Sequence, residues 1–194
     1  MPQKVPRILA FAGSARKDSY NKKLIRIAAD AARVAGAEVT LIDLADFPLP
    51  IMDEDLEKKG FPENASKLKQ LFLEHEGLLL SCPEYNSSIT PLLKNSIDWV
   101  SRPQPGEPRL AAYINKVAVL MAASPGSLGG LRGLVHVRSI LQNIGVIVLP
   151  DQRAVPNAHK EFTEDGQLRD EPLRKGIEGL GQALVKMLQQ LAKD

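Results

Sequence analysis

The chain has 194 residues, of which 44% are hydrophobic and 25% charged; this excludes a disordered chain and predicts one domain spanning residues 1–194. Its net charge of +2 excludes the basic surface of a nucleic-acid-binding protein and the acidic surface of a small electron carrier. The single cysteine, Cys82, excludes a disulfide framework and predicts a reducing, cytoplasmic location. No apolar run reaches the roughly 18 residues of a membrane span, and Gly13 and Arg16 interrupt the apolar start too early for a signal peptide.

Short apolar runs alternate with longer amphipathic segments along the chain. Continuous runs such as Gly77–Cys82 predict buried strands, and apolar residues at helical spacing, as in Asn21–Gly36, predict helices. In chain order, the predicted strands are Arg7–Ala12, Glu38–Leu44, Gly77–Cys82, Lys116–Ala122 and Val146–Leu149. The predicted helices are Asn21–Gly36, Asn64–His75, Pro91–Ser101, Gly130–Asn143 and Pro172–Ala192, and residues 151–170 are predicted to be irregular.

Strands that alternate with helices predict an α/β fold. Five apolar strands fit a flavodoxin-like three-layer sandwich, with a parallel sheet of order 2-1-3-4-5 covered by helices on both faces. In such a sheet, ligands bind beyond the carboxyl ends of the strands, where the strand order reverses. The loops that follow Ala12, Cys82 and Ala122 are therefore the candidate site.

The first of these loops, Gly13–Asn21, is rich in polar side chains and leads into a helix. Ser14, Ser19 and Asn21 can donate hydrogen bonds to phosphate oxygens, and Arg16 can bind phosphate bidentately. The free N–H groups and the dipole of the helix favour an anion at the same place. The alternative is a simple helix N-cap, where Ser and Asn are common. Four convergent polar groups exceed what one cap needs, so the loop predicts a phosphate site.

The other two loops can flank a planar ring. The second provides the aromatic face of Tyr85 and amide groups, and the third contains glycines that let the backbone approach a flat ligand. A plain turn is the alternative for the glycine-rich loop. In the second loop the candidate ring contacts are Tyr85 and Asn86, and in the third they are Gly126, Gly129 and Gly130. A phosphate site beside two such loops predicts FMN as the cofactor.

Other catalytic chemistries lack their residues. The three histidines have no metal-ligand spacing, and no Gly-x-Ser-x-Gly or P-loop motif is present in the sequence. Cys82 would need an arginine six residues later to act as a phosphatase nucleophile, but that position is Ser88. We therefore expect Cys82 to be a small buried residue at a strand end.

These motifs together resemble the NADPH-dependent FMN reductase family, which includes chromate, quinone and azo-dye reductases. The resemblance spans Ile8 to Leu188 and rests on Gly13–Asn21, Pro83–Asn86, Leu93–Trp99, Ser124–Gly130 and Phe162–Leu168. It implies phosphate contacts by Ser14, Arg16, Ser19 and Asn21. It also implies isoalloxazine contacts by Pro83, Glu84, Tyr85 and Asn86, with Ser124, Gly126, Gly129 and Gly130 near the opposite edge of the ring. The family further implies a homodimer or homotetramer with the flavin near the interface. Many members have Ser-Ile-Pro-Gly where this chain has Ser88-Ile89-Thr90-Pro91, which moves a proline and removes a glycine from the floor of the pocket.

The resemblance implies an enzyme that passes a hydride from NADPH or NADH through FMN to a small-molecule electron acceptor. A quinone, an azo compound, free flavin or chromate would each serve, and no side chain is required as an acid or base because the flavin N5 carries the hydride. The alternatives are a non-enzymatic electron carrier and a redox-responsive interaction protein. The acceptor and the choice of nicotinamide stay open, with Lys17, Arg102 and Arg109 as candidate contacts of a 2′-phosphate.

Overall fold

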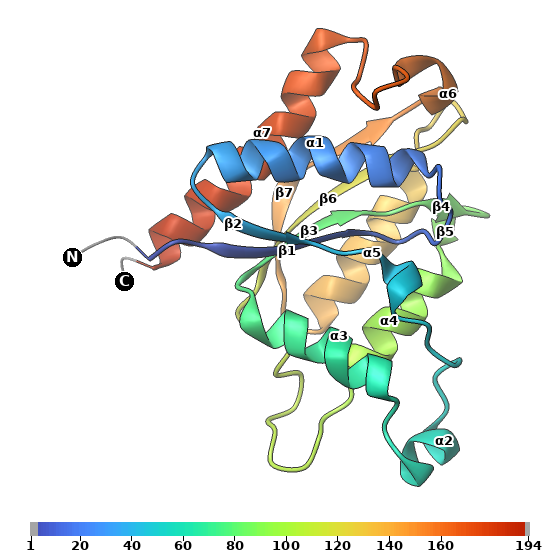
Figure 1. The fold of residues 1–194 in the computed structure, drawn as a ribbon, viewed down its shortest axis with the longest axis vertical. Coiled ribbons are helices and arrows are strands. Elements are labelled where there is room, and N and C mark those ends of the chain that lie inside the picture. The colour runs from blue at the N-terminus through green and yellow to red at the C-terminus, as the bar shows by residue number, and fades with distance from the viewer. Residues whose placement is uncertain (1–3, 193–194) are drawn as a thin grey trace.

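The computed structural model describes residues 4–192, in which five parallel strands form one sheet. The strands are β1 (Arg7–Ala12), β2 (Glu38–Leu41), β3 (Gly77–Ser81), β6 (Val117–Ala123) and β7 (Ile147–Val155). Their order, β2-β1-β3-β6-β7, confirms the predicted order and the flavodoxin-like α/β class. Figure 1 shows the strands pointing the same way, so that their carboxyl ends meet at one edge.

Helices cover both faces of the sheet, as a three-layer sandwich requires. Two helices, α1 (Tyr20–Val34) and α7 (Glu171–Leu191), lie on one face (Figure 1). The other face is covered by α3 (Glu63–Glu74), α4 (Pro91–Ser101) and α5 (Leu131–Asn143). Neighbouring β1 residues Ile8 and Leu9 point into opposite cores, and both are fully buried. Burial on both sides explains why the central strands β3 and β6 are nearly continuous apolar runs.

The prediction that residues 151–170 are irregular was wrong at its start, because β7 continues to Val155. The strand bulges: Ala118 pairs with Val148 but Leu120 pairs with Gln152, so three residues of β7 stand opposite one of β6. Pro150, which cannot donate to a ladder, lies in this bulge. The bulged carbonyls are held by the Arg138 guanidinium, whose Nη2 lies 2.8 Å from the Leu149 oxygen and 3.2 Å from that of Pro150.

Several short elements escaped prediction. They are the 3₁₀ turn Leu44–Asp46, helix α2 (Glu54–Lys59), strands β4 (Glu84–Tyr85) and β5 (Ser88–Ile89), and helix α6 (Ala158–Glu161). β2 also ends three residues before the predicted Leu44, because the Asp43 carboxylate accepts from Ala45 N and starts the 3₁₀ turn. Within residues 4–192, no helix combines the length and apolar character that a bilayer span requires.

Candidate functional site

The three predicted loops meet at the carboxyl edge of the sheet because each is anchored to the neighbouring strand where it begins. Gly13 N donates to Ser81 O at 2.9 Å, Cys82 N to Met121 O at 2.7 Å, and Ser124 N to Val155 O at 3.1 Å. The first two loops also touch, since a Cβ built on Gly13 would lie 3.3 Å from Pro83 Cδ. The predicted juxtaposition of these loops is therefore present in the structure.

The first loop, Gly13–Asn21, hereafter the phosphate turn, leaves the start of α1 uncapped. Ser19 occupies the N-cap position with extended backbone, but its side chain makes no capping hydrogen bond, and the first turn holds no acidic residue. Ser14 and Ser19 are nevertheless 7% and 4% exposed, while Arg16 is exposed at the rim. A simple N-cap would place the serine hydroxyl on a first-turn N–H. Two buried serines beside first-turn N–H groups that lack a side-chain partner fit a phosphate instead.

Asn21 joins α1 to two strands through its buried carboxamide. Its Oδ1 accepts from Ala123 N at 3.0 Å and from Ser81 Oγ at 2.9 Å, and its Nδ2 donates to Ala123 O at 2.8 Å. The side chain therefore fixes the phosphate turn against β3 and β6. Asn21 therefore has a structural role, and its contact with phosphate stays a prediction.

Thr90, which sequence reasoning noted only as a departure from the family pattern, is a buried link between the first two loops. Its hydroxyl donates to Gly13 O at 2.7 Å and accepts from Leu93 N at 3.2 Å. It is also the N-cap of α4, with Pro91 at the first helical position. A threonine followed by proline before an apolar helical run is a recognisable helix start, and that signal was available in the sequence.

The second loop is a β-hairpin. β4 and β5 are joined by Asn86 and Ser87, whose φ angles of 50° and 69° fit a two-residue type I′ turn. Tyr85 is 53% exposed. The hairpin presents an aromatic side chain at the edge of the sheet, as predicted, but on a more rigid support than a loop.

Glu84 ties the hairpin to α5. Its carboxylate accepts from Gly133 N at 3.0 Å and from Arg132 Nη2 at 2.9 Å. Burial raises the pKa of Glu84, but these hydrogen bonds outweigh burial and the pKa lies below its usual value. Because the carboxylate of Glu84 is held in this way, only the backbone of Glu84 can face an isoalloxazine ring. That contact stays a prediction.

The third loop needs its glycines for packing. Gly129 and Gly130 have φ angles of 64° and 93°, and a Cβ on them would lie 2.7 Å from Pro156 N and 2.8 Å from Ala122 Cβ, respectively. Ser124 Oγ accepts from Gly126 N at 3.2 Å within the same turn. These contacts explain Gly129 and Gly130 without a ligand, and the ring contacts assigned to Ser124, Gly126, Gly129 and Gly130 stay predictions.

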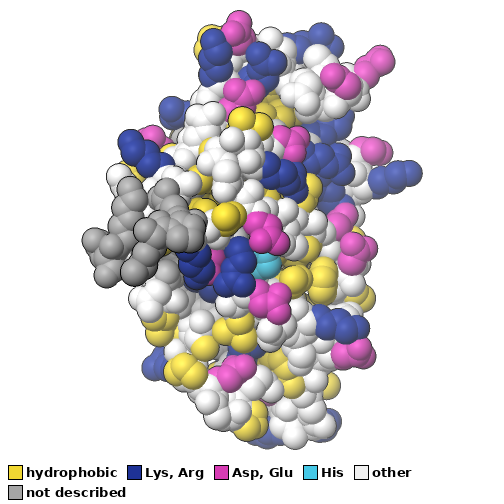
Figure 2. All heavy atoms as spheres, turned by 60° about the vertical axis from the view of Figure 1, so that its left-hand side comes forward, with side chains coloured by type: hydrophobic (Ala, Val, Ile, Leu, Met, Phe, Trp, Pro, Cys, Tyr) yellow, Lys and Arg dark blue, Asp and Glu magenta, His cyan; other side chains and the backbone are white. Residues whose placement is uncertain are grey.

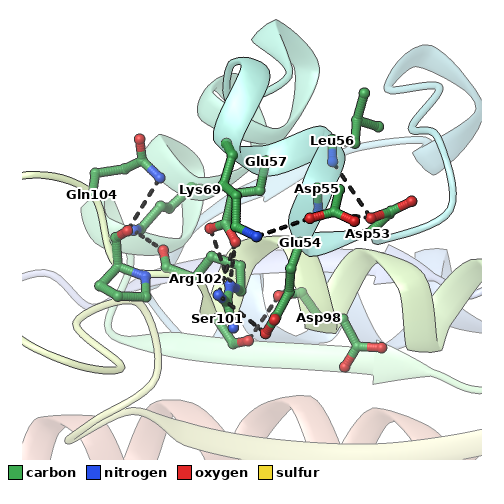
Figure 3. A network of polar contacts seen from close by, with 12 residues as sticks. Asp53, Glu54, Asp55, Leu56, Glu57, Lys69, Asp98, Ser101, Arg102 and Gln104 are labelled. Carbon is green, nitrogen blue, oxygen red and sulfur yellow. Dashed lines mark hydrogen bonds and ion pairs between the residues drawn. The ribbon is translucent and has the colours of Figure 1, made fainter.

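Two further candidates, Arg102 and Cys82, have other roles in the structure. Arg102 binds Glu57 through its Nε, 3.0 Å from both carboxylate oxygens, and joins α2 to the end of α4 (Figure 3). Arg102, a candidate contact of a 2′-phosphate, is therefore already paired with a carboxylate. Cys82 is fully buried directly after β3, which confirms the expected small buried residue at a strand end, and burial raises the pKa of its thiol to about 12. The described residues contain no cluster of metal-ligating side chains.

The sequence profile of the NADPH-dependent FMN reductase family matches residues 6–160. The chain belongs to this family. An NAD(P)H:quinone oxidoreductase of Solanum tuberosum is 33% identical, over 98% of this chain and 94% of the relative. An NAD(P)H-dependent FMN reductase of Pseudomonas aeruginosa is 32% identical, over 95% and 96%. The flavoenzyme NAD(P)H:(acceptor) oxidoreductase FerB of Paracoccus denitrificans superposes with a TM-score of 0.80 at 28% identity, over 96% of this chain and 98% of FerB.

As a member of the NADPH-dependent FMN reductase family, the protein is an oxidoreductase with FMN as its cofactor and NAD(P)H as its electron donor. This confirms the predicted cofactor and favours the reductase over the electron carrier. The uncapped α1 terminus and its two buried serine hydroxyls fit the phosphate of FMN.

Proposed function

We propose that this FMN reductase delivers its electrons to a quinone or a similar small planar acceptor, and that the phosphate turn and the hairpin hold its flavin. The potato relative is named for quinone reduction, and it matches nearly the whole chain. The observation that carries the site is the start of α1, where Ser19 stands at the N-cap and leaves the first-turn N–H groups without a side-chain partner.

The phosphate turn would bind the dianionic end of FMN. Ser14 and Ser19 donate their buried hydroxyls, Arg16 supplies the positive charge from the rim, and the first-turn N–H groups of α1 complete the set. Asn21 acts from beneath, because its carboxamide keeps the turn at a fixed place above β3 and β6.

The hairpin and the glycine-rich loop would flank the isoalloxazine ring. Tyr85 offers an exposed aromatic face, and Pro83 lies against the phosphate turn. On the other side, the Ser124–Gly130 backbone is held in place by the close packing of Gly129 and Gly130. Glu84 joins the hairpin to the element that follows the glycine-rich loop, because its carboxylate accepts from the first turn of α5.

When bound, FMN would supply the redox chemistry between the nicotinamide and the acceptor, so the chain itself supplies binding and orientation. No side chain has to move a proton for this. The nearby Cys82 thiol is neutral, and the Glu84 carboxylate is held by Arg132 and Gly133. A rigid, preorganised pocket is what the residues of the three loops contribute.

We further propose a homodimer or homotetramer in the cytoplasm. Large apolar side chains are exposed around the hairpin and the first turns of α5, namely Tyr85, Leu128, Leu131 and Val135. An apolar patch beside a ligand site is typical of a subunit contact. The free Cys82 is compatible with a reducing compartment.

Anaerobic reduction tests the proposal. The full chain loaded with FMN should lose the yellow absorbance of its flavin when NADPH or NADH is added, and should regain it when a quinone is added. Persistence of the yellow band with excess nicotinamide would contradict the enzyme. Bleaching that no quinone reverses would contradict the acceptor class.

A further inference from the structure

We propose that Thr90 is a positioning residue that sets the phosphate turn in its binding conformation and thereby selects FMN over riboflavin. This inference rests on the proposed function, and it deepens it by assigning the phosphate preference to a residue outside the turn. Thr90 lies on the segment that leads from the hairpin into α4, 77 residues away from Gly13 along the chain.

The Thr90 hydroxyl has two separate partners. Its oxygen accepts from Leu93 N at 3.2 Å, which is the helix cap, and its hydrogen is donated to Gly13 O at 2.7 Å. Thr90 is only 3% exposed, so both bonds are shielded from bulk solvent. A threonine that served α4 alone would need only the first bond.

The bond to Gly13 O fixes the direction of the next N–H group. The Gly13–Ser14 peptide is trans and planar, so its C=O and N–H point in opposite directions. With the carbonyl turned toward Thr90, Ser14 N–H is turned away from α4, and no backbone carbonyl within residues 4–192 accepts from it. The other side of Gly13 is held too, since Gly13 N donates to Ser81 O at 2.9 Å.

Among the described residues, the Thr90 hydroxyl is the only donor to Gly13 O. A Cβ on Gly13 would lie 3.0 Å from Leu93 Cβ, so the first turn of α4 is in direct contact with the phosphate turn. Losing the Thr90 hydroxyl would leave Gly13 O buried without a partner in this contact. The Gly13–Ser14 peptide would then rotate until its carbonyl found another donor, and Ser14 N–H would no longer point away from α4.

The test compares FMN with riboflavin, which has the same ring but no phosphate. The affinity of the flavin-free full chain for each is measured by titration for the parent protein, Thr90→Val, Thr90→Ala and Thr90→Ser. We expect the Val and Ala variants to bind FMN about tenfold more weakly than the parent, while riboflavin affinity stays within about twofold. Thr90→Ser, which keeps the hydroxyl, should keep the parent preference.

Asp170→Ala is the matched control, because Asp170 caps α7 by accepting from Leu173 N at 2.7 Å. It removes a helix cap of the same kind, so it should lower thermal stability without changing the ratio of the two affinities. Equal loss of FMN and riboflavin binding in the Val and Ala variants, or no loss, overturns the role of Thr90. A parent protein that binds both flavins equally overturns the proposed phosphate site itself.

Discussion

The Glu76 cluster at the amino end of the sheet and the phosphate turn at its carboxyl end use polar groups in different ways. At the amino end, charges pair with charges: the Glu76 carboxylate lies 2.7 Å from Arg7 Nη2 and 3.0 Å from Lys4 Nζ. Figure 2, which brings forward the side where the chain termini lie, shows Lys and Arg side chains interspersed with Asp and Glu. At the carboxyl end, neutral side chains such as Asn21 and Thr90 bond to the backbone instead.

The difference separates polar groups that stabilise the fold from those that are left for a ligand. The Glu76 carboxylate accepts from Lys4 Nζ, Arg7 Nη2 and Arg7 N, so its oxygens are used within the fold. At the carboxyl end, the bonds of Asn21 and Thr90 fix the backbone, while the first-turn N–H groups of α1 have no side-chain partner. The partners of a buried polar group are therefore a better guide to function than its charge.

The largest effect should come from emptying the phosphate turn. We expect the triple variant Ser14→Ala, Arg16→Ala, Ser19→Ala to lose FMN affinity by on the order of 1,000-fold, because hydrogen bonds to a charged group contribute about 1.5–3 kcal/mol each. The measurement is FMN titration of the flavin-free protein, with circular dichroism to verify the fold. Arg33→Ala, on the last turn of α1, is the control and should bind like the parent protein.

Asn21→Leu should cause the next largest effect, on stability. The substitution keeps the size of the side chain but leaves Ala123 N, Ala123 O and Ser81 Oγ without their partner. We expect the free energy of unfolding to fall by roughly 2–4 kcal/mol, as measured by urea denaturation. Asn64→Leu removes an exposed bond to Pro48 O and serves as control. Equal costs at the two positions would mean that Asn21 braces nothing.

Local patterns in the sequence predicted much of the sheet and the helices. The limits of α4 match the prediction because Pro91 sets its first turn, and the five strands were visible as apolar runs. β7 was cut short at Leu149 because Pro150 signals a strand end, whereas a bulge held by Arg138 carries the strand past it. The hairpin was missed because its strands have two residues each.

The candidate site was predictable as a set of loops but not as a set of bonds. Ser14 and Ser19 could be assigned from their position before a helix. The partners of Asn21 could not, because it bonds across 102 residues to Ala123. The double role of Thr90 likewise depends on the place of Gly13 in space. Side chains that act through distant backbone atoms leave no local pattern.

A pH titration sharpens the comparison at the amino end. Burial raises the pKa of Glu76, but hydrogen bonds from Arg7 and Lys4 outweigh it and lower the pKa to about 2. Since this value lies below that of the unfolded chain, Glu76 stabilises the fold above about pH 4.5, and the contribution is lost as the pH falls toward about 2. The loss should be roughly 1–3 kcal/mol in urea denaturation, and Glu76→Gln should remove this part of the pH dependence.

The smallest effect is expected at the rim of the same cluster. The Lys4 side chain is 65% exposed in its ion pair with Glu76, and such pairs contribute little. Lys4→Ala should therefore change the unfolding free energy by less than about 1 kcal/mol. A cost comparable with that of Asn21→Leu would show that charge pairing holds this end more strongly than the buried neutral bonds hold the other.

The position of the phosphorus atom in an experimental structure of the FMN complex tests the central claim most directly. The account predicts that the phosphate lies at the N-terminus of α1, within hydrogen-bond distance of the Ser14 and Ser19 hydroxyls. A flavin whose phosphate extends into solvent, or binds at another edge of the sheet, would contradict it.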